Sequence, residues 1–99
     1  MEYEFEWDPA KARLNLRKYR VSFERGATLF LDPRAISIPD KDHSNDEERW
    51  VTMGLDASGA LLVIVHTFEE VTGTRCRVRL ISARKATRKE MAQYIRGGR

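Results

Sequence analysis

The sequence predicts one α+β domain, in which two N-terminal helices and a short C-terminal helix pack on a mostly antiparallel sheet of about four or five strands. The 99 residues have the length of one domain, so residues 1–99 are treated as a single unit. Helical patterns come first and a series of short strand patterns follows. Hydrophobic residues make up 41% of the chain and charged residues 33%, which suits a small core under a charged surface.

The chain begins with a short strand and a helix. Residues 3–7 alternate aromatic and acidic side chains, the pattern of a half-exposed strand. Asp8 followed by Pro9 predicts a helix start, because aspartate caps a first turn and proline fits the first helical position. Helical spacing then predicts an apolar face made of Ala12, Leu16 and Tyr19.

A second helix follows after about two residues, which predicts a helical hairpin. Ser22 is its expected cap, and the helix should continue to about Leu31. Asp32-Pro33 ends it, because a residue before proline is disfavoured in the helical conformation.

The rest of the chain reads mainly as strands. Residues 60–68 are mostly apolar and β-branched, as in a central strand. Residues 58–59 predict a turn, and residues 69–74 read as a connection between strands. The strands expected after the two helices are residues 35–40, 49–57, 60–68 and 75–83.

The last strand has an informative alternation. One face should carry Arg75, Arg77, Arg79 and Ile81, and the other Cys76, Val78, Leu80 and Ser82. We therefore expect one face to pack on the core while three arginines stand in a row on the opposite face.

The chain ends in a basic strand–helix junction. Thr87 and Glu90 have the spacing of a capping box, and Met91, Tyr94 and Ile95 share a face of the helix that follows. The net charge of +3 and the isoelectric point of about 9.3 fit a polyanionic partner, although charge alone does not decide function. Basic residues at the junction are Arg84, Lys85, Arg88 and Lys89.

Composition also sets the expected compartment. Cys76 is the only cysteine, so no internal disulfide can form. The longest apolar run is far shorter than a membrane-spanning helix, and the acidic N-terminus lacks a signal-peptide pattern. We expect a cytoplasmic protein with no membrane partner.

Three blocks of the chain resemble the BrnT family of type II toxin–antitoxin modules. They are FEWDPAKARLNLRKYRVSFERGATLFLDP (5–33), DEERWVTMG (46–54) and VRLISARKATRKE (78–90), in order and at the family's spacings. The resemblance implies a RelE-like fold and ribonuclease toxin activity that inhibits translation and growth. It also implies a BrnA-type antitoxin that covers the active face, in a heterotetramer of two toxins with an antitoxin dimer. Operator DNA would be contacted only through the antitoxin.

The chain departs from the family pattern at two places. The family often reads Lys-His-Gly-Val where this chain has Lys-Tyr-Arg-Val at residues 18–21. If Arg20 takes the left-handed conformation that suits glycine at a helix end, it should cost roughly 1 kcal/mol relative to glycine. The second departure is Glu69-Glu70, which follows Thr67 where many members carry an arginine.

Metal-independent RNA cleavage needs groups that this chain can supply. The 2′-hydroxyl attacks the adjacent phosphate, and arginine forks stabilise the charge that grows on phosphorus. Arg79 and Arg84 lie in a family block and are the main catalytic candidates, with Arg77 as a phosphate-binding neighbour. Lys85 and Arg88 border a helix N-terminus, which favours anions. The alternative is that these cations form a solvated face that discourages edge pairing.

Further candidates come from other segments. His66 can act as general acid or base, or it can be a partly buried histidine with satisfied hydrogen bonds. Glu48 can serve as base while Arg49 holds phosphate, or Glu47 and Glu48 can pair with the arginine row. Lys11 matches the family motif and is a candidate for RNA binding, with surface solvation as the alternative.

No metal or cofactor site is predicted. The acidic loop with Asp40, Asp42 and Asp46 lacks the glycine and glutamate spacing of a calcium loop. One cysteine and two separated histidines do not make a zinc site, and no nucleotide fingerprint is present. The sequence therefore predicts an endoribonuclease toxin, with a non-catalytic nucleic-acid-binding or protein-interaction module as the alternative.

Overall fold

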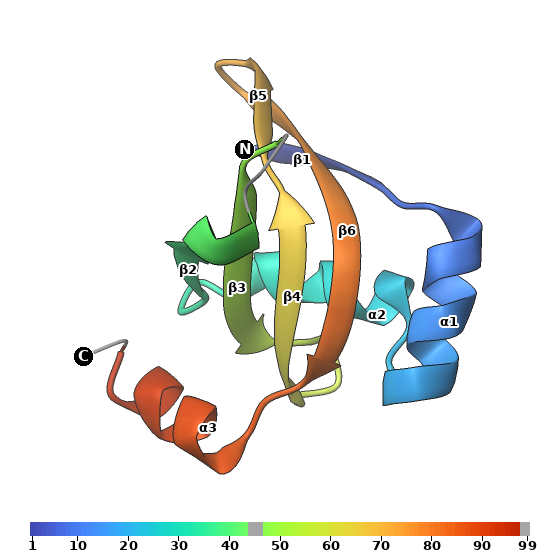
Figure 1. Ribbon diagram of the computed structural model, residues 1–99. Coiled ribbons are helices and arrows are strands. Elements are labelled where there is room, and N and C mark those ends of the chain that lie inside the picture. Colours follow the sequence, from blue (N-terminus) through green and yellow to red (C-terminus); the bar gives the residue numbers. More distant parts are fainter. Residues whose placement is uncertain (44–46, 98–99) are drawn as a thin grey trace.

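The computed structural model describes residues 1–43 and 47–97, and within them six strands form one mixed sheet. Figure 1 shows this sheet with helices around it. In chain order, the elements are β1 (Glu2–Glu6), α1 (Pro9–Tyr19), α2 (Phe23–Ala27), the 3-10 helix η1 (Thr28–Leu31), β2 (Ile36–Pro39), the 3-10 helix η2 (Lys41–His43), β3 (Arg49–Leu55), β4 (Leu61–Thr67), β5 (Glu69–Thr72), β6 (Arg75–Lys85) and α3 (Arg88–Ile95).

The sheet is built around β6, which has neighbours on both edges. The strand order is β1-β6-β4-β3-β2, and β5 also pairs with β6. Only β1 and β6 run parallel; the other described pairs are antiparallel. The α+β class is confirmed, but the expected count of four or five strands is wrong.

The additional strand is β5, in the segment that was predicted to be a connection. It continues from the end of β4 and returns into β6 through a turn at residues 73–74. Glutamate is a poor strand former, so the local pattern did not show this strand. Pairing overrides that preference, because Glu69 lies opposite Arg77 and their charges are complementary.

Both faces of β4 are buried, which explains its continuous apolar run. Leu62 and Ile64 join the main core, and α2 and η1 cover this face (Figure 1). Val63 points to the other face, where Tyr94 anchors α3. The helix α3 therefore packs on the opposite side of the sheet from α2 and η1. The main core consists of Val21, Phe23, Leu29, Leu62, Ile64, Val78, Leu80 and Ala83.

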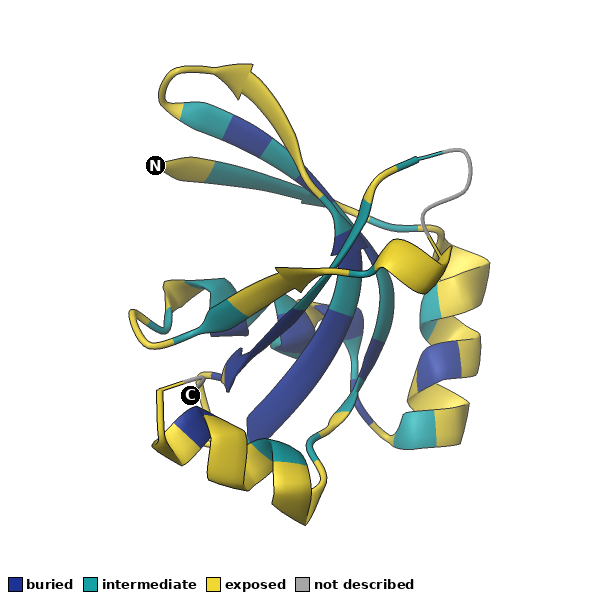
Figure 2. Ribbon diagram, turned by 60° about the vertical axis from the view of Figure 1, so that its left-hand side comes forward, coloured by how far each residue is buried: buried dark blue, intermediate teal, exposed yellow. Residues whose placement is uncertain are grey.

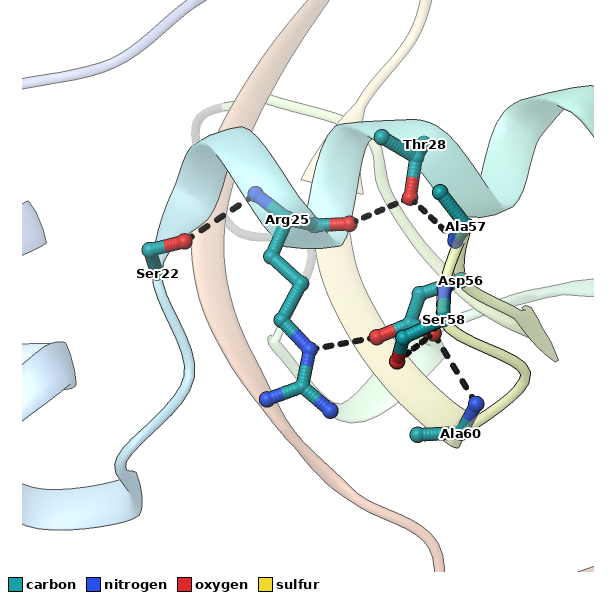
Figure 3. A network of polar contacts seen from close by, with 7 residues as sticks. All are labelled: Ser22, Arg25, Thr28, Asp56, Ala57, Ser58 and Ala60. Carbon is teal, nitrogen blue, oxygen red and sulfur yellow. Dashed lines mark hydrogen bonds and ion pairs between the residues drawn. The ribbon is translucent and has the colours of Figure 1, made fainter.

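The second helix covers the residues that were predicted, but its last turn is tighter. Ser22 caps α2 by accepting a hydrogen bond from the Arg25 backbone N–H, and η1 then continues to Leu31. Figure 3 shows how this segment is tied to the β3–β4 turn. Burial alone would raise the pKa of Asp56, but hydrogen bonds from Ser58, Ala60 and Arg25 outweigh it and lower the pKa to about 2.

The helix α1 is held by a buried amide, and the predicted apolar face is only partly confirmed: Ala12 packs against the core and Tyr19 is half-buried, but Leu16 is exposed. Leu16 is 48% exposed, whereas Asn15 is only 6% exposed. The Asn15 Nδ2 donates to the carbonyls of Val21 (3.0 Å) and Ala83 (2.9 Å), and its Oδ1 accepts from the Ala83 N–H (3.1 Å). Figure 2 shows that most of α1 is otherwise exposed.

The hydrogen bonds of Asn15 satisfy backbone groups on the edge of β6 that no strand covers. The strand β1 pairs with β6 only as far as Glu6 opposite Arg79. Beyond that point, the amide of Asn15 takes the place of a neighbouring strand at Ala83. Apolar periodicity alone could not identify a polar residue as the anchor of this helix.

The C-terminus of α1 confirms the expectation for Arg20. This residue has φ 61° and ψ 27°, and its N–H donates to the Leu16 carbonyl. It is the one non-glycine residue with positive φ among residues 1–43 and 47–97. Because L-residues other than glycine are strained there, the chain accepts a local energetic cost at this position.

We expect Asn15→Ala to lower the free energy of unfolding by roughly 2–4 kcal/mol, because it leaves buried groups of Val21 and Ala83 without partners. Urea denaturation of the purified protein measures this change. The exposed Leu14→Ala on the same helix is the matched control and should change stability by less than about 0.5 kcal/mol. Equal losses in the two variants would contradict the role of the amide.

We expect Arg20→Gly to raise the free energy of unfolding by about 1 kcal/mol, because glycine has no Cβ to strain at positive φ. The same substitution at a position with helical backbone, Arg17→Gly in the last turn of α1, should lower it by up to about 1 kcal/mol. Thermal and urea unfolding of both variants tests this opposite sign. A destabilised Arg20→Gly protein would show that the arginine side chain stabilises the fold.

Candidate active site

The arginine row on β6 lies where the alternation predicted it. Arg75, Arg77 and Arg79 are half-buried on one face, while Cys76, Val78 and Leu80 are buried on the other. Each arginine of the row meets a glutamate, so much of its charge is balanced within the protein. The pairs are Arg75–Glu4, Arg77–Glu4 (3.9 Å), Arg77–Glu69 (3.5 Å) and Arg79–Glu47.

A bulge in β6 places Arg84 on the same face as this row. Leu80 lies opposite His66, but Ser82 lies opposite Val65, so Ile81 is an extra residue in the strand. Arg84 is five positions after Arg79, and in a regular strand the two side chains would point to opposite faces. The extra residue reverses that parity, and Arg84 lies opposite Val63 on the α3 side of the sheet.

Arg79 belongs to a small charged cluster at one end of the sheet. Its Nη2 contacts Glu47 Oε1, and the same oxygen is 3.9 Å from Arg49 Nε. The backbone N–H of Arg79 donates to Thr67 Oγ1 (3.2 Å), and Thr67 lies opposite Arg49 in the sheet. Two arginines and one carboxylate, from β6 and from the start of β3, thus converge on the face opposite the main core.

The carboxylate in this cluster is Glu47, whereas our sequence candidate for the base was Glu48. Glu48 is exposed, and within the described residues no side-chain hydrogen bond or ion pair involves it. The two-residue alternation of side chains along a strand could have identified Glu47 from the sequence. Glu47 is two residues from Arg49 and therefore tends to share its face, whereas Glu48 has the opposite parity.

Arg84 is held by Glu90 in a two-point contact. Its Nη1 and Nη2 donate to Glu90 Oε1 (2.8 Å) and Oε2 (2.9 Å). Glu90 also accepts from the Thr87 N–H (2.8 Å), which completes the capping box that the sequence predicted. The hydrogen bond from Arg84, opposed in part by burial, lowers the pKa of Glu90 to about 2. The same contact raises the pKa of Arg84.

His66 is buried, with 2% exposure, and both of its ring nitrogens have partners. Its Nδ1 lies 2.8 Å from the Thr67 carbonyl, so that nitrogen carries the proton. Its Nε2 then accepts from the Thr52 hydroxyl (2.6 Å). Burial lowers the pKa of His66, although the bond to the Thr67 carbonyl opposes this. The geometry is that of a satisfied histidine beneath Thr67.

The remaining candidates for RNA binding lie in two places. Lys85 and Arg88 are exposed at the junction between β6 and α3, beside Arg84. Lys11 is exposed on α1, which contacts β6. Within residues 1–43 and 47–97, no three His, Cys, Asp or Glu side chains gather as a potential metal site. None of the helices described for these residues is long and apolar enough to cross a membrane.

Comparisons with known proteins found matches to both the sequence and the fold. A family model described as the ribonuclease toxin BrnT of type II toxin–antitoxin systems matches residues 7–90. The fold is similar to the crystal structure of the Brucella abortus ribonuclease toxin BrnT, with a TM-score of 0.60 and 17% sequence identity. That match covers 89% of this chain and 100% of the other. A search of curated proteins found no match.

We expect Glu90 to give the protein an acid-sensitive increment of stability. Because its pKa is about 2 instead of 4.5, this increment is complete above pH 4.5 and is lost as the pH falls towards 2. We expect a loss of about 1–2 kcal/mol, after allowing for the partial exposure of the pair.

Glu90→Gln tests this expectation, since glutamine can keep the capping hydrogen bond but not the charge. Urea unfolding from pH 7 to pH 2.5 should show a shallower acid slope in the variant. Asp56 contributes to the slope in both proteins and therefore cancels in the comparison. Identical slopes would mean that the contact between Arg84 and Glu90 is not formed in solution.

Proposed function

The chain belongs to the BrnT family of ribonuclease toxins from type II toxin–antitoxin systems, and from this premise we propose that it is a RelE-like, metal-independent endoribonuclease of the cytoplasm. It cuts RNA, inhibits translation and growth, and is neutralised by its antitoxin. The observation that carries this proposal is the meeting of Arg79, Glu47 and Arg49 on the exposed sheet face, inside the matched region.

The cluster can supply the groups that cleavage needs. In the proposed reaction, a phosphate of the RNA lies against Arg79 and Arg49, and Glu47 takes the proton of the neighbouring 2′-hydroxyl. The 2′-oxygen then attacks phosphorus, and the two guanidinium groups stabilise the added negative charge. The 5′-oxygen leaves with a proton from water, which gives a 2′,3′-cyclic phosphate and a 5′-hydroxyl.

In this scheme, His66 is a positioning residue. Its Nδ1–H holds the Thr67 carbonyl, and Thr67 in turn accepts the backbone N–H of Arg79. These contacts support a rigid strand end beneath the cluster. Burial and its two hydrogen bonds keep His66 away from the exposed face on which RNA would lie.

Arg84 is proposed to bind a different phosphate of the same strand. At a rise of about 3.3 Å per residue, the Cα atoms of Arg79 and Arg84 lie roughly 15 Å apart, which is too far for both arginines to serve one phosphate with ease. The carboxylate of Glu90 now fills the Arg84 fork, as a phosphate would. Binding of RNA at Arg84 therefore replaces Glu90, while Lys85 and Arg88 add positive charge nearby.

A type II toxin has an antitoxin partner, and we propose that this one is of the BrnA type and covers the same face. An apolar groove of about 290 Å³ supports this placement, because it lies on the face that carries the arginines. Two toxins with an antitoxin dimer form the proposed complex, which contacts operator DNA through the antitoxin. The groove is lined by Ile36, Ile38, Val51, Met53, Val63, Glu90 and Gln93.

We expect Arg79→Gln to lower the rate of RNA cleavage by roughly 10²–10³-fold, because it removes a charged donor from the transition state. Glu47→Gln should lower the rate by roughly 10²-fold or more, through loss of the base. The measurements are cleavage of RNA by the purified protein and growth arrest on induction. Arg75→Gln, which removes an arginine of the same row that is paired with Glu4, is the control and should cleave like the parent.

Two results would count against this assignment. A folded Arg79→Gln protein with parental activity would remove the cluster from the reaction. A parent protein that binds RNA but does not cut it would favour the alternative, a nucleic-acid-binding module.

A further inference from the structure

The helix α1 carries a concentration of positive charge that the proposed reaction does not use. Its cations are all exposed, and among residues 1–43 and 47–97 none of them forms an ion pair. The arginines of β6, by contrast, all meet glutamates. The α1 cationic surface, as we call it, consists of Lys11, Arg13, Arg17, Lys18 and Arg20.

This surface lowers the stability of its own helix in two ways. Arg13 and Arg17 are four residues apart, and like charges at that spacing repel each other on a helix. Arg20 adopts a left-handed conformation that glycine would take with less strain. Fold stability explains neither feature. Backbone strain such as that at Arg20 often marks a functional position, so we looked for a ligand here. Because the surface is cationic, that ligand would be negatively charged.

The surface is hollowed where its arginines lie. One shallow hollow of about 470 Å³ is lined by Arg13, Leu16, Arg17 and Arg20. A second, of about 280 Å³, lies between α1 and the bulge of β6. Lys11 and Lys18 line the second hollow beside Ile81 and Ser82. The two hollows lie on opposite flanks of α1, and guanidinium or ammonium groups, which bind phosphate, line each of them.

The α1 cationic surface continues towards the candidate active site. The α1 helix lies along β6, on the edge away from β4 (Figure 1). Tyr19, at its C-terminal end, is close enough to Arg84 to influence its pKa. The side chain of Lys18 lies over the Tyr19 ring, 5.0 Å from its centre. Positive charge therefore extends from α1 through this corner to Arg84 and Lys85.

The chemistry of the surface favours a nucleic acid over an amphipathic protein helix. Leu14 and Leu16 are 61% and 48% exposed, but residues two apart do not face the same side of a helix. They make no continuous apolar stripe for a partner helix to cover, and singly exposed leucines are common. Its cations lie on both flanks of the helix, with Arg17 on the solvent side between them.

We propose that the α1 cationic surface binds the phosphate backbone of single-stranded RNA and leads it past Tyr19 to Arg84, an inference that rests on the proposed ribonuclease function. The contacts are electrostatic, so the surface raises affinity without selecting a base sequence. It also provides the free cations that the paired arginines of β6 do not.

The test uses a fluorescent single-stranded oligonucleotide made of 2′-O-methyl RNA, which lacks the nucleophile and so is not cleaved. Fluorescence anisotropy gives its dissociation constant over a range of salt concentrations. We compare the full-length protein with Arg17→Gln/Arg20→Gly and with the control Arg75→Gln. Glycine at position 20 relieves backbone strain, so the double variant should remain folded, which circular dichroism and urea unfolding check.

We expect the double variant to bind about tenfold or more weakly at low salt. The slope of log affinity against log salt should fall by roughly 1.4, which corresponds to two phosphate contacts on a single strand. Arg75→Gln should stay within about twofold of the parent. Equal affinity and slope in the double variant, equal losses in the control, or no binding by the parent would each overturn the proposal.

Two further outcomes separate this proposal from its premise. If the parent and the double variant bind RNA alike, but only the parent binds the antitoxin, the surface faces a protein and the proposal is wrong. If the double variant loses RNA binding but the parent does not cleave all-ribose RNA, the RNA surface stands and the proposed nuclease activity fails.

Discussion

The open edge of β6 is the constraint on which the rest of the structure depends. The strand is eleven residues long, but β1 accompanies it only as far as Arg79. Beyond that point, the N–H and C=O of Ala83 are buried and must find partners, and the amide of Asn15 supplies both. The same amide also donates to the carbonyl of Val21, a residue of the main core. One side chain thus places α1 along the sheet and leaves its cationic side exposed.

The bulge at Ile81 lies between the end of β1 and the position of Asn15, and it determines which charges share a face. Without it, Arg84 would point away from Arg79. With it, both arginines lie on the α3 side of the sheet. Glutamates then balance most of this face, so that Arg79 meets Glu47 and Arg84 meets Glu90. Such ion pairs hold the arginines in place when no ligand is bound, and a phosphate can replace the carboxylate.

Much of the local structure followed from the sequence, and the reasons are short-range. The Asp8 and Ser22 caps, the capping box of Thr87 with Glu90 and the alternation along β6 all depend on neighbours within a few residues. Strain at Arg20 followed from comparing one position with a family pattern that has glycine. The functional candidates Arg79, Arg49 and Arg84 were likewise visible as basic residues near strand ends. Pairing of Glu47 with the arginine row was one of two alternatives that the sequence left open, whereas the pairing of Arg84 with Glu90 was not foreseen.

The sequence by itself determined the caps, most of the strands, the exposed arginine row and the resemblance to BrnT toxins, because those depend on local spacing. Only the tertiary structure decided that β5 is a strand, that Asn15 and not Leu16 anchors α1, and that Glu47 meets both Arg79 and Arg49. These outcomes join residues that are far apart in the chain. Local propensity carries no information about a backbone group left without a partner, or a charge left without a counter-charge, on a distant strand.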